Sequence, residues 1–358
     1  MEVDIPRVLI IILNWNSWEH TCNCLKSLYE IDYGNYCIIV ADNGSADNSI
    51  ARIKECAEGG FQTSKGRKMR IFEYTKEETE ADGGRESEME HLPSDRKLVL
   101  IKNGNNIGFA GGNNTGIRYA MNALDPKYIL LLNSDTLVDK TFLGELVTAI
   151  EKDDTIGSVQ SLLLRPGGEL VDSLGQEILW STVGDIGFGS RYLDNSLVSK
   201  VEIFGPCAAA ALYRASSLLE VGLFDESFFI MGEDVDLSWR LRLKGYSSFL
   251  VPSSVVYHKR GISGGMQPST VLINRYYGNR NWLLIVLRYY PLSVVHLVPR
   301  RLLSVFTRCI SNATRLGKVH EMFQQFYRSL KLRRIISKNP TLKELQVQWI
   351  KDKQLSIE

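Results

Sequence analysis

The segment "FDESFFIMGEDVDLSWRLRLKGY" (224–246) combines acidic residues with aromatic and aliphatic ones. Its five acids are Asp225, Glu226, Glu233, Asp234 and Asp236. Acidic side chains near a core normally need a partner or a chemical task. A carboxylate among aromatic side chains has a raised pKa, which suits a general base that takes a proton from a hydroxyl group. We therefore treat this segment as a candidate catalytic centre.

A second explanation applies to three of these acids. Residues 231–244 are predicted to form a helix that Gly245 closes, and acids in a first helical turn are stabilised by the helix dipole. Consecutive helical residues point about 100° apart, so Glu233 and Asp234 cannot perform the same task. One of the two is expected to face the ligand and the other to orient or cap, whereas Asp236 is explained most simply by the dipole.

Two residues at the ends of apolar runs could bind a divalent cation. Asp135 follows Ser134 in "YILLLNSDT", and His258 ends "FLVPSSVVYH". Carboxylate oxygens suit Mg²⁺ or Mn²⁺, and a neutral imidazole binds divalent metals. Each residue also has a structural interpretation, because Asp135 could cap the next helix and a lone histidine is often a structural residue. From these segments alone both interpretations stay open.

Polar residues also end the first two apolar runs. "IIILNWN" ends with Asn14 and Asn16, and "VADNGS" holds Asp42 and Asn43. An acid at such a position can bind a ribose hydroxyl or a base edge. The alternative is an Asx-turn, after which Asp47 caps the following helix.

The loop "NNIGFAGGNNTGI" (105–117) is rich in glycine and asparagine. Gly108 and Gly112 would let the backbone approach a ligand closely, and Asn113 lies in the helix that the loop opens. The pattern differs from the GxGxxG fingerprint, whose glycines follow the first strand of a dinucleotide-binding fold. A dehydrogenase is therefore disfavoured.

The elements that must position these residues alternate between strand and helix. A parallel sheet with helices on both faces is the expected result, with ligands beyond the carboxyl ends of the strands. The expected strands are 7–15, 36–45, 98–103, 128–136 and 248–258, and the expected helices are 17–30, 47–58, 113–124, 140–153 and 231–244. The fold class predicted is therefore α/β.

We expect residues 1–270 to form the catalytic domain, with one interruption at residues 58–97. The stretch "EYTKEETEADGGRESEME" within it has many acids and almost no apolar pattern. Such a composition is typical of a solvated, flexible insertion.

The formal charge of +1 hides a strong asymmetry along the chain. Residues 259–338 contain fifteen Lys/Arg and one acid, a net charge of +14, and the rest of the chain carries −13. We expect residues 271–358 to form a basic, aromatic helical region that binds an anionic membrane surface. The alternative is a set of helices packed on the enzyme's own core. No apolar window there reaches the ~20 residues of a spanning helix.

Taken in order, six motifs resemble the inverting family 2 glycosyltransferases of GT-A fold, in the rhamnosyltransferase-like branch. They are "IIILNWN", "VADNGSADNS", "NIGFAGGNNTGI", "LLLNSDT", "GLFDESFFIMGEDVDLSWRLRLKGY" and "VVYHKRGIS". Each motif is weak alone, but six in this order are specific, and the resemblance covers about residues 6–290. It implies a Rossmann-like nucleotide-diphospho-sugar transferase fold, a sugar nucleotide donor, a divalent metal (Mg²⁺ or Mn²⁺) and an acceptor hydroxyl.

The resemblance also implies roles for individual residues. Asp135 takes the last position of the family's metal-binding DxD motif, whose first position is Asn133 here, and His258 matches the family's metal-binding histidine. Asp234 matches the catalytic base, with Glu233 as its neighbour or as an acceptor contact.

The remaining implied roles concern the donor. The turns with Asn14, Asn16, Asp42 and Asn43 resemble the nucleoside-binding turns of the family, with Asp42 near the base or ribose. The loop with Gly108, Gly112 and Asn113 resembles the one that lines the nucleotide, and Ser134 belongs to the same donor site.

The function implied is transfer of a sugar from dTDP-rhamnose or another nucleotide-diphosphate sugar to a glycan in cell-surface polysaccharide synthesis. A polyprenyl-diphosphate-linked acceptor and a cytoplasmic position on the inner face of the plasma membrane would agree with the basic region. Six scattered cysteines without a CxxC pair favour a reducing compartment, and no N-terminal signal pattern is evident.

Two other function classes compete with this one. A sugar nucleotidyltransferase could use a similar sheet, but it predicts a basic glycine-rich loop after the first strand, where this chain has "NWNSWEH". A nucleic-acid-binding protein could use the basic region, but no nucleic-acid motif supports it, and we expect no nucleic-acid partner.

Overall fold

The computed structural model describes residues 5–59, 68–81, 84–179, 182–191, 201–260, 268–293, 296 and 298–351. Its helices are α1 (Trp18–Tyr29), α2 (Ser49–Glu58), α3 (Lys76–Glu80), α4 (Glu86–Glu90), α5 (Gly108–Ala123), α6 (Phe142–Ile150), α7 (Ala215–Val221), α8 (Glu233–Leu243), α9 (Pro268–Tyr289), α11 (Pro299–Arg315), α12 (Val319–Ile336) and α13 (Thr341–Trp349). Within the described ranges, short 3-10 helices are η2 (Ser94–Arg96) and η3 (Glu226–Phe228).

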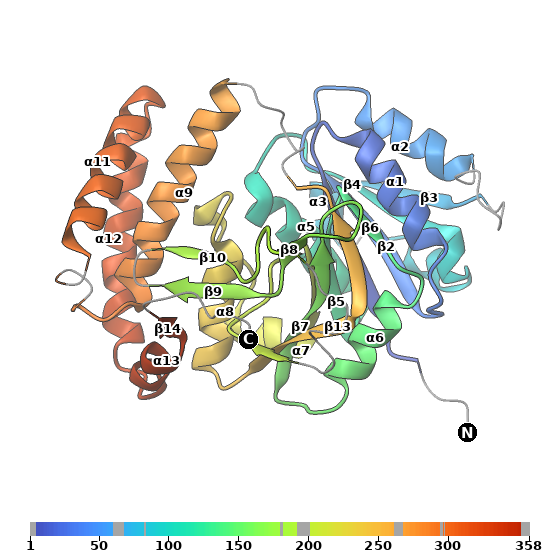
Figure 1. Cartoon of the computed structure of the whole chain (residues 1–358). Helices are drawn as coiled ribbons and strands as arrows, with labels where there is room; N and C mark the ends of the chain where they lie inside the picture. Colours follow the sequence, from blue (N-terminus) through green and yellow to red (C-terminus); the bar gives the residue numbers. More distant parts are fainter. Residues whose placement is uncertain are drawn as a thin grey trace.

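The strands form one large sheet and one small one (Figure 1). They are β1 (Val8–Asn14), β2 (Tyr36–Asp42), β3 (Arg70–Thr75), β4 (Lys97–Lys102), β5 (Tyr128–Asn133), β6 (Thr136–Val138), β7 (Ile156–Leu164), β8 (Val171–Ser173), β9 (Gln176–Leu179), β10 (Val183–Asp185), β11 (Val201–Ile203), β12 (Ala210–Arg214), β13 (Ser247–His258) and β14 (Ile350–Lys351). The large sheet has the order β11-β13-β7-β12-β5-β1-β2-β4-β3, with β6 on β13 and β8 on β7.

The half of the large sheet that contains β1 is parallel, as the alternating sequence predicts. Strands β5, β1, β2, β4 and β3 run in one direction, and β12 is antiparallel to both β5 and β7. The register pairs Asn14 with Asp42 and Leu13 with Asn133. Because the parallel strands end together, the motifs that follow β1, β2 and β5 meet at one edge of the sheet.

Both faces of this sheet are covered by helices, so the central strands are apolar on both sides. Val8, Ile10 and Ile12 of β1 pack into a core with side chains of α1, α2 and α6. Leu9 and Ile11, which alternate with them, pack into a second core with side chains of α5, α7 and α8. The predicted α/β class with helices on both faces is confirmed.

The acidic stretch at 58–97 differs from the expected solvated insertion. Residues 70–75 form β3, which pairs with β4 at the edge of the large sheet. Phe72, Tyr74 and Met89 are buried in the core that includes α5. Phe72 and Tyr74 are spaced at the period of a strand and separated by Glu73, a pattern that the average composition of the stretch conceals. Residues 60–67, 82 and 83 of this stretch lie outside the described residues.

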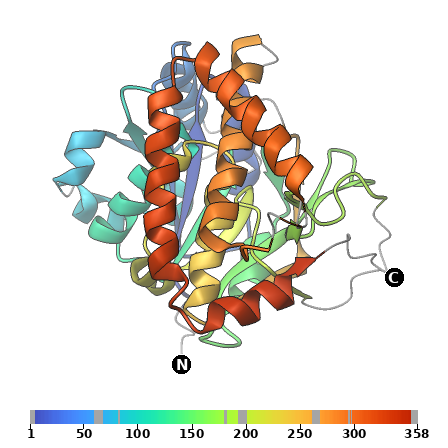
Figure 2. The same cartoon turned by 90° about the vertical axis from the view of Figure 1, so that its left-hand side faces the viewer.

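The region after residue 267 forms helices that pack on the catalytic domain. In Figures 1 and 2, α9 lies next to α8, and α11 and α12 lie on the outer side of α9. Leu284 and Ile285, from the stretch "WLLIVL", are buried among residues of α8 and of the other C-terminal helices. The membrane-interface interpretation is therefore wrong for this stretch, because its apolar side chains already have partners within the protein. Of the helices that the structure describes, none has the length and apolar character needed to cross a bilayer.

Candidate active site

Asp234 lies in the first turn of α8, where its carboxylate meets two backbone donors. Its Oδ1 accepts a hydrogen bond from the amide of Val235 (2.8 Å), and its Oδ2 accepts one from the amide of Ala208 (3.3 Å). The side chain keeps partial access to solvent. Burial, and then the charge of Asp185, raise the pKa of Asp234 to about 6 despite the two backbone donors. A half-buried carboxylate with this pKa can accept a proton near neutral pH.

Glu233 has a different environment from its neighbour. Its side chain is buried, and its Oε2 has no hydrogen-bond partner. Burial, followed by the charge of Asp234, raises the pKa of Glu233 to about 8. The pKa of Glu233 is therefore raised further above its ordinary value than that of Asp234, whose side chain also keeps partial access to solvent. This difference supports the prediction that the two acids have separate tasks, and it makes Asp234 the better proton acceptor of the pair.

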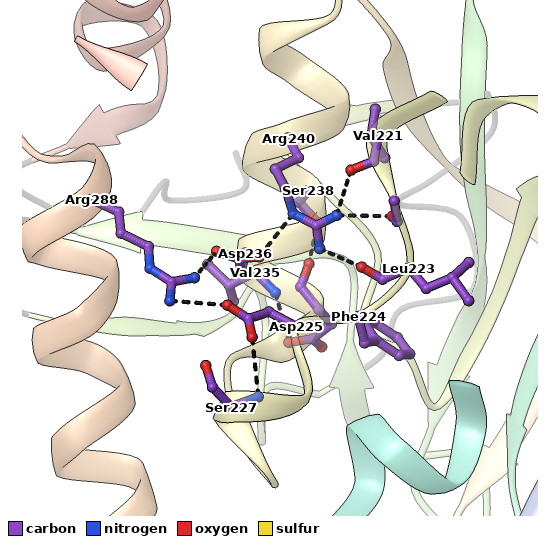
Figure 3. Close-up of polar contacts among 12 residues, drawn as sticks. Val221, Leu223, Phe224, Asp225, Ser227, Val235, Asp236, Ser238, Arg240 and Arg288 are labelled. Atoms are coloured by element: carbon purple, nitrogen blue, oxygen red, sulfur yellow. Dashed lines mark hydrogen bonds and ion pairs between the residues drawn. The ribbon is translucent and has the colours of Figure 1, made fainter. Parts of the chain in front are cut away.

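The helix dipole does not fully explain Asp236, which also has charged and hydrogen-bonding partners on two helices. It is buried and binds Arg240 of its own helix, with Nε 2.9 Å from Oδ2. From α9, Arg288 Nη1 (2.7 Å) and the hydroxyl of Tyr289 (2.8 Å) both donate to Oδ1. Burial alone would raise the pKa of Asp236, but the two arginine charges hold it below the ordinary value. Figure 3 shows Arg288 reaching Asp236 and Asp225 from the neighbouring helix.

The structure brings the two predicted metal ligands together. Asp135 follows β5 and His258 ends β13, and Oδ1 of Asp135 lies 3.2 Å from Nε2 of His258. Both side chains are buried. The other ring nitrogen of His258, Nδ1, lies 2.7 Å from Oδ2 of Asp172. Burial would lower the pKa of His258, but hydrogen bonds to the two carboxylates outweigh it and raise the pKa to about 9.

Three polar residues of this region were missed by the sequence interpretation. Asp172 of β8 is fully buried and binds both His258 and Arg260. Arg260 also pairs with Asp185 of β10, where Nη2 lies 2.6 Å from Oδ2. The charge of Asp185 in turn acts on Asp234, so these residues connect the histidine with the candidate base. The sequence offered one weak indication of a role for Asp172, because it is a lone acid in the apolar run "LVDSL".

The predicted nucleoside-binding residues Asn14 and Asp42 form one hydrogen-bonded network at the ends of β1 and β2. Asn14 Nδ2 donates to Oδ1 of Asp42 (2.7 Å), which also accepts from the hydroxyl of Ser45 (2.6 Å). Asn16 has a positive φ of 48°, and its Oδ1 accepts from the amide of Ala46 (2.8 Å). These side chains fix the two turns against each other, so the edge of the sheet is shaped before a ligand binds.

Asn43 and the predicted glycines connect this network to α5. Asn43 Nδ2 donates to the carbonyl of Gly108 (3.1 Å). A Cβ at Gly112 would lie 2.4 Å from a methyl carbon of Leu13, so this glycine allows α5 to pack on β1. Asn113 is buried, and its Nδ2 donates to the carbonyl of Phe109 in its own helix (2.9 Å).

Further contacts join the loop with Gly108 and Gly112, here called the donor loop, and strand β5 to the candidate base. Gly108 has a φ of +81°, and a Cβ there would lie 2.5 Å from the carbonyl oxygen of Phe229, four residues before Glu233. At the other side, the amide of Asn133 donates to the carbonyl of Ala209 (3.0 Å), next to the Ala208 amide that binds Asp234. Ser134, buried, lies between Asn133 and the metal-ligand candidate Asp135. The segments that hold the residues predicted to bind the donor, bind the metal and act as the base are thus linked by direct contacts.

This chain belongs to glycosyltransferase family 2. Residues 9–77 match the family described as glycosyl transferase family 2, and residues 78–275, more than half of the chain, match the one described as glycosyltransferase like family 2. The family that the six motifs resemble is therefore confirmed.

Among curated relatives, the chain is 27 % identical over 162 residues to the low-salt glycan biosynthesis hexosyltransferase Agl10 of Haloferax volcanii. It is 26 % identical over 216 residues to the N-acetylglucosaminyl-diphospho-decaprenol L-rhamnosyltransferase of Mycobacterium tuberculosis. These matches cover 45 % and 53 % of this chain. The chain spans about half (52 %) of the length of the first relative and 67 % of the second.

A solved structure with the same fold is the mannosyltransferase PcManGT of Pyrobaculum calidifontis, in complex with GDP-Man and Mn²⁺. The TM-score is 0.52 at 14 % identity, with 96 % of this chain and 88 % of that chain covered. At this identity the likeness establishes the fold alone, and the GT-A fold predicted from the motifs is confirmed.

Proposed function

We propose that this chain transfers a hexose from a nucleotide-diphosphate sugar to a hydroxyl group of a glycan or lipid-linked glycan, with inversion at the anomeric carbon. The observation that carries the proposal is the position of Asp234. Its carboxylate is partly exposed, is held by the amides of Val235 and Ala208, and lies beside the buried Glu233. Through Ala208 and Ala209 it is joined to the end of β5, where the Asp135–His258 pair lies.

In the proposed reaction Asp234 accepts the proton of the acceptor hydroxyl. The acceptor oxygen forms a bond to the anomeric carbon of the donor, and the bond from that carbon to the diphosphate oxygen breaks. The nucleoside diphosphate leaves with the bonding electrons. Because a single displacement occurs on the face opposite the leaving group, the anomeric configuration inverts. A positioned base contributes about 10²–10⁴-fold to such a step.

A divalent cation, Mg²⁺ or Mn²⁺, is part of the proposal because the donor chemistry of two residues fits it. Asp135 offers a carboxylate oxygen and His258 an imidazole nitrogen, and Asp172 holds the other ring nitrogen as carboxylates do for metal-bound histidines. When bound, the cation would neutralise negative charge on the departing diphosphate. In the described part of the chain, no group of three or more His, Cys, Asp or Glu side chains could hold a metal, so donor oxygens or water would supply the other ligands.

The donor site is proposed to follow the ends of β1 and β2. Asn14, Asn16, Asp42 and Asn43 shape the turns there, and the glycine-rich start of α5 lies next to them. The mycobacterial relative is named an L-rhamnosyltransferase, so an activated rhamnose such as dTDP-rhamnose is the first donor to test.

The acceptor is proposed to be a polyprenyl-diphosphate-linked glycan at the inner face of the cytoplasmic membrane. The mycobacterial relative is named for a decaprenol-linked substrate. On α12, one exposed surface of this chain combines apolar and basic side chains, as a helix in a membrane interface does. We call it the α12 surface; it consists of Phe323, Tyr327, Leu330, Lys331 and Arg334.

Flotation with vesicles tests the membrane part of the proposal. The wild-type protein is expected to float with vesicles that contain phosphatidylglycerol and not with neutral phosphatidylcholine vesicles. The double variant Phe323→Ser/Tyr327→Ser should lose this binding, whereas Val347→Ser, an exposed apolar residue on α13, should keep it. Equal flotation of both variants would remove the α12 surface from the proposal.

Donor binding and product stereochemistry test the reaction itself. A thermal-shift panel of UDP, dTDP and GDP, each with and without Mn²⁺, should identify one base whose stabilisation depends on the metal. Transfer from the matching sugar nucleotide should give a product of inverted anomeric configuration by NMR. A sugar nucleotidyltransferase would instead release pyrophosphate from a nucleoside triphosphate and a sugar phosphate, and that outcome would refute the proposal.

A further inference from the structure

The segment that leads into α8 has an unusual backbone conformation. Phe229 has φ 63° and ψ −63°, and the amide of Ile230 donates to the carbonyl of Phe228 (2.7 Å). This is a classic γ-turn, a rare and strained conformation. Two residues later, Met231 has a φ of 72°. Such backbone conformations persist only where the surrounding structure holds them in place.

Helix α9 supplies the groups that hold this segment. Asn281 is buried, and its Nδ2 lies within hydrogen-bond distance of three carbonyl oxygens: those of Phe228 (2.8 Å), Ile230 (2.8 Å) and Met231 (2.7 Å). One side-chain amide therefore binds the carbonyl groups on both sides of the γ-turn.

The residue before Asn281 acts on the same segment. Arg280 is fully buried, and its Nη2 donates to the carbonyls of Ser227 and Phe228, the latter at 3.2 Å. Its Nη1 pairs with Glu321 of α12 (2.7 Å), which keeps the guanidinium charge compensated.

A second point of attachment lies further along the same helix. Arg288 is seven residues after Asn281, about two helical turns, so both side chains leave the same face of α9. Arg288 Nη1 binds Asp236 (2.7 Å) and Nη2 binds Asp225 (3.0 Å), one acid on each side of the γ-turn segment (Figure 3). Arg288 and Asp236 are buried, and the side chain of Asp225 is 12 % exposed.

From these contacts we propose that Asn281, together with Arg280 and Arg288, positions the catalytic base. These α9 residues fix the backbone just before Glu233 and Asp234 and the helix turn just after them, so the carboxylate of Asp234 is held relative to Ala208 and the donor loop. The inference rests on the proposed role of Asp234. All three residues lie after residue 275, where the family match ends, so the C-terminal helices complete the catalytic unit of this chain.

Asn281→Ala tests the proposal, with Asn339→Ala as the matched control. Asn339 Nδ2 donates to the carbonyl of Leu243 (3.1 Å), at the opposite end of α8 from Asp234. Each variant removes one side-chain amide, which binds the segment before α8 in Asn281→Ala and the last residue of α8 in Asn339→Ala. Since misplacing a reacting group by about 1 Å can cost roughly 10²-fold, we expect kcat of Asn281→Ala to fall about 100-fold with the donor KM unchanged. Asn339→Ala should keep kcat within about twofold of the wild type when each protein is assayed the same number of degrees below its own melting temperature.

The pH profile and the exchange of backbone amides separate positioning from general destabilisation. A displaced Asp234 should shift the acid limb of the kcat profile, whereas a smaller folded fraction would lower the amplitude alone. Hydrogen–deuterium exchange in peptides covering 224–236 should rise by at least about tenfold in Asn281→Ala and stay at the wild-type rate in Asn339→Ala.

Three results would overturn the proposal: kcat of Asn281→Ala within twofold of wild type, an equal loss in Asn339→Ala, or unchanged exchange at 224–236. If the wild-type chain transferred no sugar, the proposed function would fail, and the exchange experiment would still decide whether α9 holds the segment.

Discussion

His258 and Asp135 face each other across the ends of β13 and β5, with Nε2 and Oδ1 3.2 Å apart. The residues are far apart in the sequence, and both side chains are buried. Asp172 fixes the imidazole from the opposite side at 2.7 Å. Such an arrangement presents one ring nitrogen and one carboxylate oxygen in a fixed orientation, which is the basis of the metal prediction.

His258→Ala should abolish the part of nucleotide binding that depends on metal, because it removes one of the two protein ligands. Asp172→Asn should lower Mn²⁺ affinity about 10–100-fold, since it removes the charge that orients the imidazole. Thermal shift of the nucleotide complex against Mn²⁺ concentration measures both effects. His320→Ala, at an exposed position of α12, serves as the control. An unchanged Mn²⁺ titration in His258→Ala would remove the ligand assignment.

The activity should fall on the acid side of pH about 6. The pKa of Asp234 is raised to that value by burial and by the charge of Asp185, and only the ionised form accepts a proton. The rate kcat/KM should therefore drop about tenfold per pH unit below 6. In Asp185→Asn the limb should move to lower pH, because a negative charge near Asp234 is gone. A limb that stays in place in this variant would mean that Asp185 does not act on the titrating group.

Gly108→Ala should impair transfer far more than Gly104→Ala. Both glycines have positive φ (81° and 74°), so both substitutions carry a similar backbone cost. A Cβ at Gly108 would lie 2.5 Å from the carbonyl oxygen of Phe229, whereas a Cβ at Gly104 meets no atom within 4 Å. A comparison of the steady-state rates and nucleotide affinities of the two variants isolates the effect of the close contact between Gly108 and Phe229, which precedes the candidate base Asp234. Equal rates would show that this contact has no catalytic importance.

Arg288→Met should destabilise the fold by about 3 kcal/mol, because it leaves the buried Asp236 and the partly buried Asp225 without this partner. The added change Asp236→Asn should restore part of that loss by removing one of the uncompensated charges. Urea unfolding of the wild type, of the single variants Arg288→Met and Asp236→Asn and of the double variant measures these differences. If the double variant were less stable by the sum of both single effects, the two residues would not be energetically coupled.

Much of the parallel sheet could be predicted because its strands are continuous apolar runs buried on both faces. Because the ends of these runs can be read from the sequence, Asn14, Asp42 and Asp135 could be assigned to the carboxyl ends of the strands. Asp172 and Asp185 could not be predicted in this way, because they lie in short strands and their partners Arg260 and His258 are more than 70 residues away.

The C-terminal helices show a second limit of sequence interpretation. A run of arginines in a basic region is usually exposed, and nothing local distinguishes Arg280 and Arg288 from their neighbours. Their burial depends on carbonyls and acids about 50 residues earlier, including Asp236. Long-range partners of this kind also explain why β3 was hidden within an acidic stretch: its place in the sheet is set by pairing with β4.

Sugar transfer by Asp234→Asn, measured in parallel with nucleotide binding, tests the role of this carboxylate most directly. The amide keeps the size of the side chain but cannot take the proton of the acceptor, so kcat should fall at least about 100-fold. Metal-dependent binding of the nucleoside diphosphate should stay at the wild-type level, and Asp154→Asn, at an exposed position, should have normal activity. Near-normal turnover by Asp234→Asn would show that this carboxylate is not the catalytic base.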